Sequence, residues 1–210
     1  GVWKSKTVNF QLKKAYLSVR LLCSPQGQDW RKLTLYPLLP GFGDILLITL
    51  AVTAAAAGLA AGGMKPFCNI YSSFSQRAYD QILHDVALQE LPVVLCLDRG
   101  GLVGEDGATH HGCYDMSAYR SIPGAVIAAP KDELELKNMM YSAMLSETGP
   151  YIIRYPRGYG EGIDWRSPEY EKLETGRGEL VLEGTDVAVF AAGPFVWRAV
   201  EAAEKRKAEE

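Results

Sequence analysis

Hydrophobic and polar positions follow two alternating periods from Pro66 onward. Short apolar runs at 66–71, 93–97, 125–129 and 151–155 predict strands, and the intervening stretches at 76–89 and 131–145 place apolar residues at helical spacing. Every residue from 93 to 97 is apolar, which is typical of a strand covered on both faces. The pattern predicts an α/β fold in which a mostly parallel sheet carries helices on both faces.

A run without charge precedes these elements. Residues 45–61 contain no ionisable side chain and are rich in alanine, so they are only weakly hydrophobic. This composition favours a helix buried within a protein over a membrane span. We therefore expect one domain over residues 44–160, whereas residues 1–43 show no clear period and stay unassigned.

The sequence after this domain changes character. Residues 161–177 are rich in glycine, proline and charge, which is typical of a linker. Beyond it, 178–183 and 186–192 predict two strands and 195–210 predicts a helix. We expect residues 178–210 to be the start of a second α/β domain.

Composition narrows the class of protein. The chain is 48% hydrophobic and 22% charged, as in ordinary globular proteins, which argues against disorder. The net charge of the whole chain is −3, yet the segment before Asp44 contains seven basic residues and only one acid. Because these cations are scattered, they favour a solvated surface over an arm that binds nucleic acid or membrane. The four cysteines form no C-x-x-C pair, so we expect reduced thiols and a cytoplasmic protein.

Polar clusters follow three of the predicted strands. They occupy residues 71–77, 98–112 and 154–158, and the second contains five glycines. Ligands of open α/β sheets bind at the carboxyl ends of the strands. We therefore expect the three clusters to form one pocket.

The side chains in these clusters suit an anionic substrate. Arg77, Arg99 and Arg157 carry planar guanidinium groups, which match phosphate and carboxylate oxygens. An imidazole side chain can pass a proton to or from a carbonyl or hydroxyl, and His110 lies in the same glycine-rich stretch as Asp106, so the two are candidates for acid and base catalysis.

Each of these residues also has a structural interpretation. Arginines at strand ends commonly form structural ion pairs. His84 fits a hydrogen-bonded helix residue, His111 fits a loop cap, and Phe74 taken alone fits the core. The residue types by themselves leave both interpretations open.

Specific motifs give these clusters a family resemblance. DRGGLVGEDGATHHG at 98–112, SSFSQR at 72–77 and RYPRG at 154–158 resemble the 1-deoxy-D-xylulose-5-phosphate synthase family. The likeness is close over about 51–160 and looser towards the end of the chain. The glycine-rich block is specific to that family, whereas RYPRG is shared with wider transketolase-like enzymes.

The resemblance implies a thiamine diphosphate enzyme, a homodimer when full length, that binds neither nucleic acid nor membrane. An enzyme of this family decarboxylates pyruvate and joins the resulting two-carbon unit to D-glyceraldehyde 3-phosphate. Its product feeds isoprenoid, thiamine and pyridoxal synthesis. Carried over by motif, Phe74 would stack on the pyrimidine ring of the cofactor, with Tyr71 and Arg77 lining the same pocket.

The resemblance also implies roles around the substrates. Arg99 and Arg157 would hold the phosphate of D-glyceraldehyde 3-phosphate. Asp106 and His110 would position the pyruvate-derived intermediate or move protons, and are the catalytic candidates.

One departure from the family concerns its activating glutamate. The family has a glutamate just before A-V-T that bonds the pyrimidine nitrogen, and in this sequence Ile48 occupies that position. The nearest acid is Asp44. The G-D-G motif with which the family holds magnesium and diphosphate is also absent from these 210 residues, so we expect the metal site in a separate N-terminal domain and no activity from this chain alone.

Several explanations of this pattern stay open at the level of sequence. A truncated gene product, a misread frame, a rearranged copy and an inactive paralogue would all show it. Another transketolase-like protein, such as a 2-oxo acid dehydrogenase β-subunit, shares the expected fold. A non-catalytic module that pairs with an intact synthase is the remaining alternative.

Overall fold

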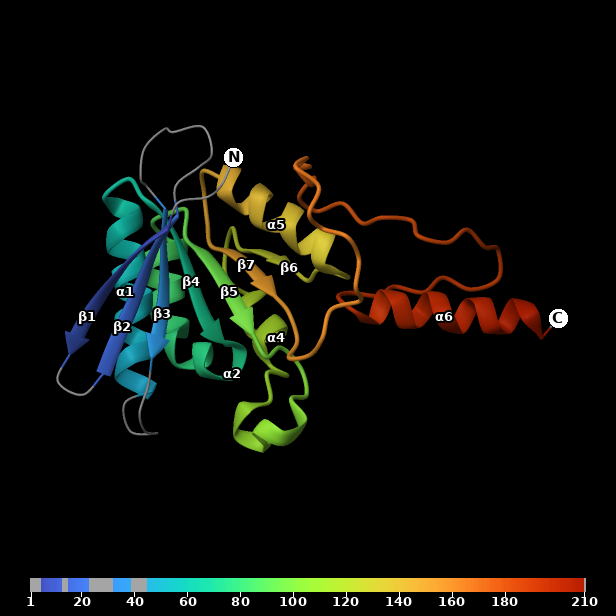
Figure 1. The fold of residues 1–210 in the computed structure, drawn as a ribbon, viewed down its shortest axis with the longest axis horizontal. Helices are drawn as coiled ribbons and strands as arrows, with labels where there is room; N and C mark the ends of the chain where they lie inside the picture. The colour runs from blue at the N-terminus through green and yellow to red at the C-terminus, as the bar shows by residue number, and fades with distance from the viewer. Residues whose placement is uncertain (1–4, 13–14, 23–31, 39–44, 210) are drawn as a thin grey trace. The chain divides into compact units, whose positions relative to one another are not determined.

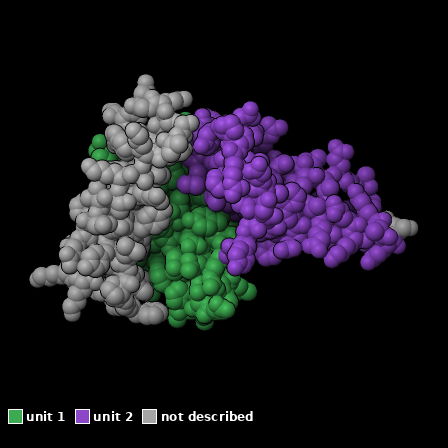
Figure 2. All heavy atoms as spheres, in the orientation of Figure 1, with its two compact units in different colours: residues 1–128, 143–157 green, residues 129–142, 158–210 purple. Residues whose placement is uncertain are grey.

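The computed structural model describes residues 5–12, 15–22, 32–38 and 45–209, with side chains described from Thr49 onward. The chain divides into two compact units, one formed by residues 1–128 and 143–157 and the other by residues 129–142 and 158–210 (Figure 2). Both predicted site clusters around 71–77 and 98–112 belong to the first unit, as does the cluster up to Arg157.

A seven-stranded sheet forms the centre of the first unit, with strand order β1-β2-β3-β4-β5-β7-β6 (Figure 1). Strands β3, β4, β5, β7 and β6 pair in parallel, whereas β1, β2 and β3 pair antiparallel. The four predicted strands and the mostly parallel sheet are therefore confirmed. The strands are β1 (Ser5–Leu12), β2 (Ala15–Leu22), β3 (Lys32–Leu38), β4 (Lys65–Tyr71), β5 (Val94–Asp98), β6 (Val126–Ala128) and β7 (Tyr151–Arg154).

The first three strands lie in the stretch that the sequence pattern left unassigned. A signal for β1 was present, because Val8, Phe10 and Leu12 alternate with polar residues. This strand was nevertheless not predicted, because the alternating run is short and no obvious turn motif follows it. Its hairpin partner β2 pairs with it from Ser5 to Leu12 and brings these residues into the same sheet as the predicted domain.

Helices form at each of the four predicted positions, and two short helices, at Ser72–Ser75 and Asp115–Tyr119, were not predicted. They are α1 (Ile45–Ala61), α2 (Ser72–Ser75), α3 (Tyr79–Gln81), α4 (Asp115–Tyr119), α5 (Glu133–Leu145) and α6 (Phe195–Ala208). The single helix predicted over 76–89 is broken into a 3-10 turn, a short α-helical turn and a π-helix at Ile82–Ala87. Among the described residues, no helix is both long and apolar enough to cross a membrane.

Apolar side chains of the sheet and α1 form the core of the first unit. Leu95, Leu97 and Ile152 have no exposed surface, and Ala56 of α1 is equally buried. A buried leucine or isoleucine contributes roughly 1.5–3 kcal/mol relative to an exposed one. The alanines explain why the uncharged run forms a core helix, since small side chains let α1 lie close to β4.

The second unit is mostly irregular beyond α5. Residues 158–194 contain no helix and no strand, so the two strands predicted at 178–183 and 186–192 are wrong. Their apolar side chains are exposed, with Phe190 at 98% and Val187 at 79%. A strand needs a neighbour for its backbone groups, and none of the described strands pairs with these residues. Helix α6 forms close to its predicted bounds, ending with the basic turn that favours a helix C-terminus.

Candidate active site

The three polar clusters meet at the carboxyl ends of β4, β5 and β7. These strands are parallel neighbours, and the register places Tyr71 beside Asp98 and Leu97 beside Arg154. β4 runs directly into α2, while β5 runs into the glycine-rich loop at 99–112. The sheet therefore delivers all three clusters to one edge.

Arg99 begins the glycine-rich loop in an unusual backbone conformation. Its φ is 59°, a value that a residue other than glycine rarely adopts. The guanidinium group is held on three sides: Nε donates to Asp106 at 2.6 Å, Nη1 donates to Asp98 at 2.7 Å, and Cζ lies 3.9 Å from the centroid of the Tyr71 ring. The hydrogen bond from Arg99 holds the pKa of Asp106 below its usual range.

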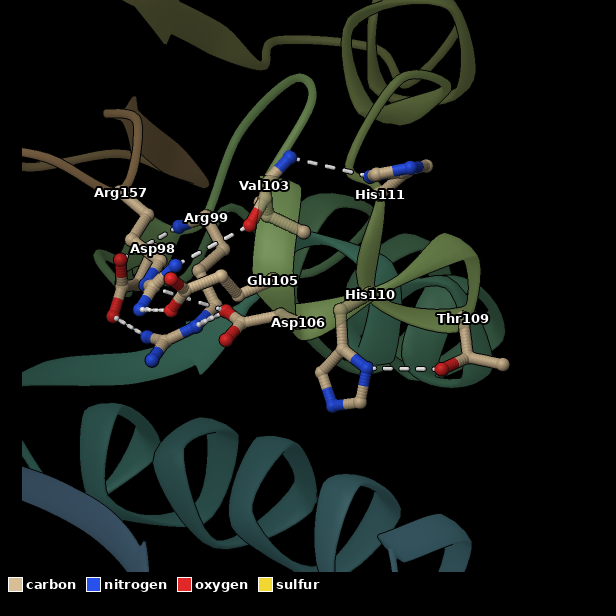
Figure 3. Close-up of polar contacts among 9 residues, drawn as sticks. All are labelled: Asp98, Arg99, Val103, Glu105, Asp106, Thr109, His110, His111 and Arg157. Carbon is tan, nitrogen blue, oxygen red and sulfur yellow. Dashed lines mark hydrogen bonds and ion pairs between the residues drawn. The ribbon is translucent and has the colours of Figure 1, made fainter.

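Arg157 approaches the same carboxylate from β7. Its Nε lies 3.6 Å from Asp106, and its Nη2 lies 3.5 Å from Glu105. Asp106 thus stands between the two arginines (Figure 3). The fold brings together the two residues predicted to hold a phosphate, and an anion already occupies the space between them in the form of a carboxylate. Their predicted role in substrate binding stays a prediction.

An aromatic cluster lies next to this ion-pair group. The rings of Tyr71 and Phe74 stack at a centroid distance of 5.1 Å, and His110 lies 5.1 Å from Phe74 and 6.2 Å from Tyr71. The guanidinium carbon of Arg77 lies 5.9 Å from the Phe74 centroid. The three residues predicted to bind the pyrimidine ring therefore form one group with a predicted catalytic residue. A flat apolar ring flanked by a cation suits a heteroaromatic ligand.

The three histidines have different surroundings. His110 shares a 2.9 Å hydrogen bond with the hydroxyl of Thr109 (Figure 3). His111 accepts a hydrogen bond at Nδ1 from the backbone of Val103, which fits the predicted loop cap. His84 lies 2.9 Å from Asp80 one helical turn away, which fits the predicted hydrogen-bonded helix residue.

A polar cleft of about 420 Å³ is lined by residues of both the 71–77 cluster and the glycine-rich loop. The hydroxyl of Ser73 is buried there and has no hydrogen-bond partner within the described residues. A buried hydroxyl without a hydrogen bond lowers the stability of the folded state, so we expect a polar ligand or a water molecule to form a hydrogen bond with Ser73. The cleft is lined by Ser73, Gln76, Arg77, Ala108, Thr109, His111 and Tyr114.

Sequence reasoning missed a buried ion pair beneath the loop. Asp115 is 1% exposed and accepts 2.8 Å hydrogen bonds from both Ser72 and Arg154. Asp115 is the first residue of α4, and an acidic residue in a first helical turn is a helix-start signal that was available in the sequence. Arg154 stood in a predicted cluster without an assigned role.

Comparison with known proteins gives the class to which this fold and site belong. The family model described as "Transketolase, pyrimidine binding domain" matches residues 50–161. The chain belongs to the transketolase family, and these residues are its pyrimidine-binding domain.

Curated relatives narrow the class to one enzyme. The chain is 53% identical over 154 residues to the 1-deoxy-D-xylulose-5-phosphate synthase of Bacteroides thetaiotaomicron, covering 73% of this chain and 24% of that protein. It is 54% identical over 164 residues to the same enzyme of Oleidesulfovibrio alaskensis, covering 78% and 25% respectively. The chain therefore spans about a quarter of the length of these relatives, and over that part it is about half identical to them.

A solved structure supports the same fold. The chain is similar to a protein described as "Split gene transketolase, inactive beta4 tetramer", with a TM-score of 0.66 and 27% identity over 77% of this chain and 51% of that chain. The expected transketolase-like α/β fold is confirmed.

The described residues fit one part of the family's cofactor. Phe74 and Tyr71 form an aromatic surface beside the guanidinium group of Arg77, and such a surface is compatible with the predicted binding of a pyrimidine ring. Within the described part of the chain, no group of three His, Cys, Asp or Glu side chains could hold a metal ion. Ile48 is predicted to occupy the position of the family glutamate. Its side chain, and all of Asp44, lie outside the described residues.

Proposed function

We propose that this chain supplies the pyrimidine-binding side of a 1-deoxy-D-xylulose-5-phosphate synthase active site. The observation that carries the proposal is the grouping of Phe74, His110, Arg99, Asp106 and Arg157 at one sheet edge. Sequence identity of about half to synthases over the same residues supports it. The substrates are then pyruvate and D-glyceraldehyde 3-phosphate.

The cofactor side of the proposed site lies around Phe74. Thiamine diphosphate, when bound, supplies the carbon that takes up the two-carbon unit. Phe74 stacks on the pyrimidine ring, while Tyr71 supports Phe74 from its other side and Arg77 borders the ring. Magnesium and the diphosphate are bound by a domain outside these 210 residues.

The substrate side lies around the paired arginines. Arg99 and Arg157 bind the phosphate of D-glyceraldehyde 3-phosphate through charged hydrogen bonds. The carboxylate of Asp106 occupies the space between the two arginines in this structure, so the phosphate replaces Asp106 as their partner when the substrate binds. His110 lies within ring contact of Phe74 and transfers a proton to or from the reacting oxygen.

The isolated chain is proposed to be inactive. An isoleucine at position 48 cannot accept or share a proton with the pyrimidine, and the metal site is elsewhere. The test is turnover of pyruvate and D-glyceraldehyde 3-phosphate by the purified chain with thiamine diphosphate and magnesium. We expect a rate equal to that of a control without protein, and turnover above that control contradicts the proposal.

A second candidate is a non-catalytic subunit that assembles with other chains in the cytoplasm. The split-gene transketolase is described as an inactive tetramer, which shows that a related chain exists without activity. Light scattering on the purified chain and co-purification with an intact synthase test this alternative. Assembly with the synthase, together with no effect of thiamine diphosphate on thermal stability, favours the subunit over the enzyme.

A 2-oxo acid dehydrogenase β-subunit is disfavoured by the synthase relatives.

A further inference from the structure

A buried carboxylate, that of Asp115, follows the glycine-rich loop at the start of α4. Asp115 is 1% exposed, and its Oδ2 accepts a hydrogen bond from Ser72 and another from Nε of Arg154, each at 2.8 Å. Its Oδ1 accepts a 2.8 Å hydrogen bond from the backbone of Met116. Both carboxylate oxygens are therefore satisfied by partners from α2, β7 and α4.

The same arginine reaches the loop itself. Nη2 of Arg154 donates to the carbonyl of Gly112 at 3.2 Å. Gly112 and Gly101 in turn exchange two backbone hydrogen bonds of 2.8 Å, which close the loop at its base. Gly100 donates to the carbonyl of Tyr155 at 2.9 Å. Both ends of the loop are thus tied to the strand that carries Arg154.

The packing around this closure leaves no spare volume. A Cβ on Gly112 would lie 2.4 Å from the Ser72 hydroxyl and 2.5 Å from the carbonyl of Arg99. A Cβ on Gly100 would lie 3.0 Å from the Arg154 side chain. The side chains of Ser72 and Arg154 therefore pack closely against the base of the loop at Gly112 and Gly100.

We propose that Asp115 is a positioning residue for the active-site loop. By fixing Arg154 and Ser72 it fixes the base of the loop at Gly101 and Gly112, and hence holds His110 against Phe74. Asp115 itself touches neither the aromatic cluster nor the paired arginines in any described contact, so it acts through its neighbours. The chemical use of His110 rests on the proposed function, whereas the positioning does not.

The energetic pattern agrees with positioning in preference to general stabilisation. A buried ion pair often adds little net stability compared with apolar residues of the same volume. Removing one partner nevertheless leaves an uncompensated charge, which is strongly unfavourable. The pair is therefore well suited to select one arrangement of the loop.

The experiment uses the purified chain without cofactor. Amide hydrogen exchange is measured for the loop residues 101–111 and for β4, β5 and β7, and the ring-proton resonance of His110 is recorded by NMR. The chain has three histidines, so His84→Gln and His111→Gln assign the resonances. In Asp115→Asn we expect exchange in 101–111 to rise roughly ten- to a hundredfold, as for the loss of a charged hydrogen bond. The His110 resonance should move as its ring leaves the Phe74 face.

Asp132→Asn is the matched control. Asp132 accepts a hydrogen bond from the backbone of Glu135 at the start of α5, so its substitution also removes a helix-start carboxylate. Asp132 makes no described contact with the loop. We expect no change in the loop or at His110. A uniform rise across β4, β5 and β7 in Asp115→Asn, or an unmoved His110 resonance, overturns the proposal.

Two milder variants decide the matter if Asp115→Asn does not fold. Ser72→Ala removes one hydrogen bond to Asp115 and leaves its ion pair with Arg154 intact. Arg154→Lys keeps the positive charge but removes the guanidinium nitrogen that donates to the carbonyl of Gly112. Both should raise exchange in the loop more than in the sheet, and equal rises in loop and sheet reject positioning. Because no turnover is measured, a failure of the synthase proposal leaves this result standing, and the reverse also holds.

Discussion

The ring centroids of Phe74 and His110 lie 5.1 Å apart, so the residue proposed to stack on the cofactor is in contact with the residue proposed to move protons. In a full-length synthase carrying residues 51–160 of this chain, Phe74→Leu removes the aromatic face. Aromatic pairs contribute about 0.5–1.5 kcal/mol beyond burial, so thiamine diphosphate should bind roughly threefold to tenfold more weakly. Calorimetric titration measures the affinity. Tyr159→Leu, at a fully exposed ring, is the control, and equal affinities in both variants contradict the stacking role.

The arginine pair predicts a difference between the two substrates. In the same full-length protein, Arg99→Ala or Arg157→Ala should raise the KM for D-glyceraldehyde 3-phosphate more than the KM for pyruvate. Hydrogen bonds to charged groups are worth about 1.5–3 kcal/mol, which corresponds to a ten- to a hundredfold loss. Arg120→Ala, at an exposed position, should leave both values unchanged. Equal losses for the two substrates would mean that the arginines form structural ion pairs only.

The closed base of the loop predicts opposite effects of two glycine substitutions. Gly112→Ala places a methyl group 2.4 Å from the Ser72 hydroxyl, and overpacking of this kind costs about 1–3 kcal/mol. Gly58→Ala, within α1 and with open space around it, should stabilise by about 0.5–1 kcal/mol because alanine favours a helix. Urea unfolding of the two variants measures the difference. An unchanged midpoint for Gly112→Ala would show that the loop base is loosely packed.

Sequence patterns predicted the parallel strands because a strand that is buried on both faces consists of consecutive apolar residues, as β5 does. They also predicted which residues gather at the sheet edge, since polar clusters after parallel strands share that edge. The side-chain partners were beyond reach. Nothing in the order of residues shows that Asp106 lies between Arg99 and Arg157, because that depends on the path of the loop and on the positive φ of Arg99.

The strands expected near the end of the chain failed for a different reason. Leu180, Val187 and Phe190 have the composition of a buried strand, yet they are exposed. A strand is stabilised by its neighbours and by the face that it covers, and local pattern reports neither. Conversely, β2 and β3 were missed although they are paired along their length. The signal was present, because Leu17, Val19 and Leu21 alternate with polar residues in β2, as Leu33 and Leu35 do around Thr34 in β3.

The isoleucine at the family's glutamate position predicts a specific defect. In a full-length synthase in which residues 45–50 of this chain replace the family motif, deprotonation of the cofactor should be slow, because positioned proton transfer contributes about 10²–10⁴-fold. Ile48→Glu alone should recover part of that factor. Isotope exchange at the reactive carbon of thiamine diphosphate measures the step directly. Exchange as fast as in the intact synthase, before any restoration, would show that Ile48 does not occupy the glutamate position.

The most direct test of the account is a domain transplant. Residues 51–160 of this chain replace the matching residues of the Bacteroides thetaiotaomicron synthase, which keeps its own glutamate and its own metal site. If the grouping around Phe74, His110 and the paired arginines is a synthase site, the chimera should convert pyruvate and D-glyceraldehyde 3-phosphate to 1-deoxy-D-xylulose 5-phosphate. The same chimera carrying His110→Ala should lose most of this rate. A chimera that folds and binds thiamine diphosphate but forms no product would contradict the claim that these residues make up half of a working synthase site.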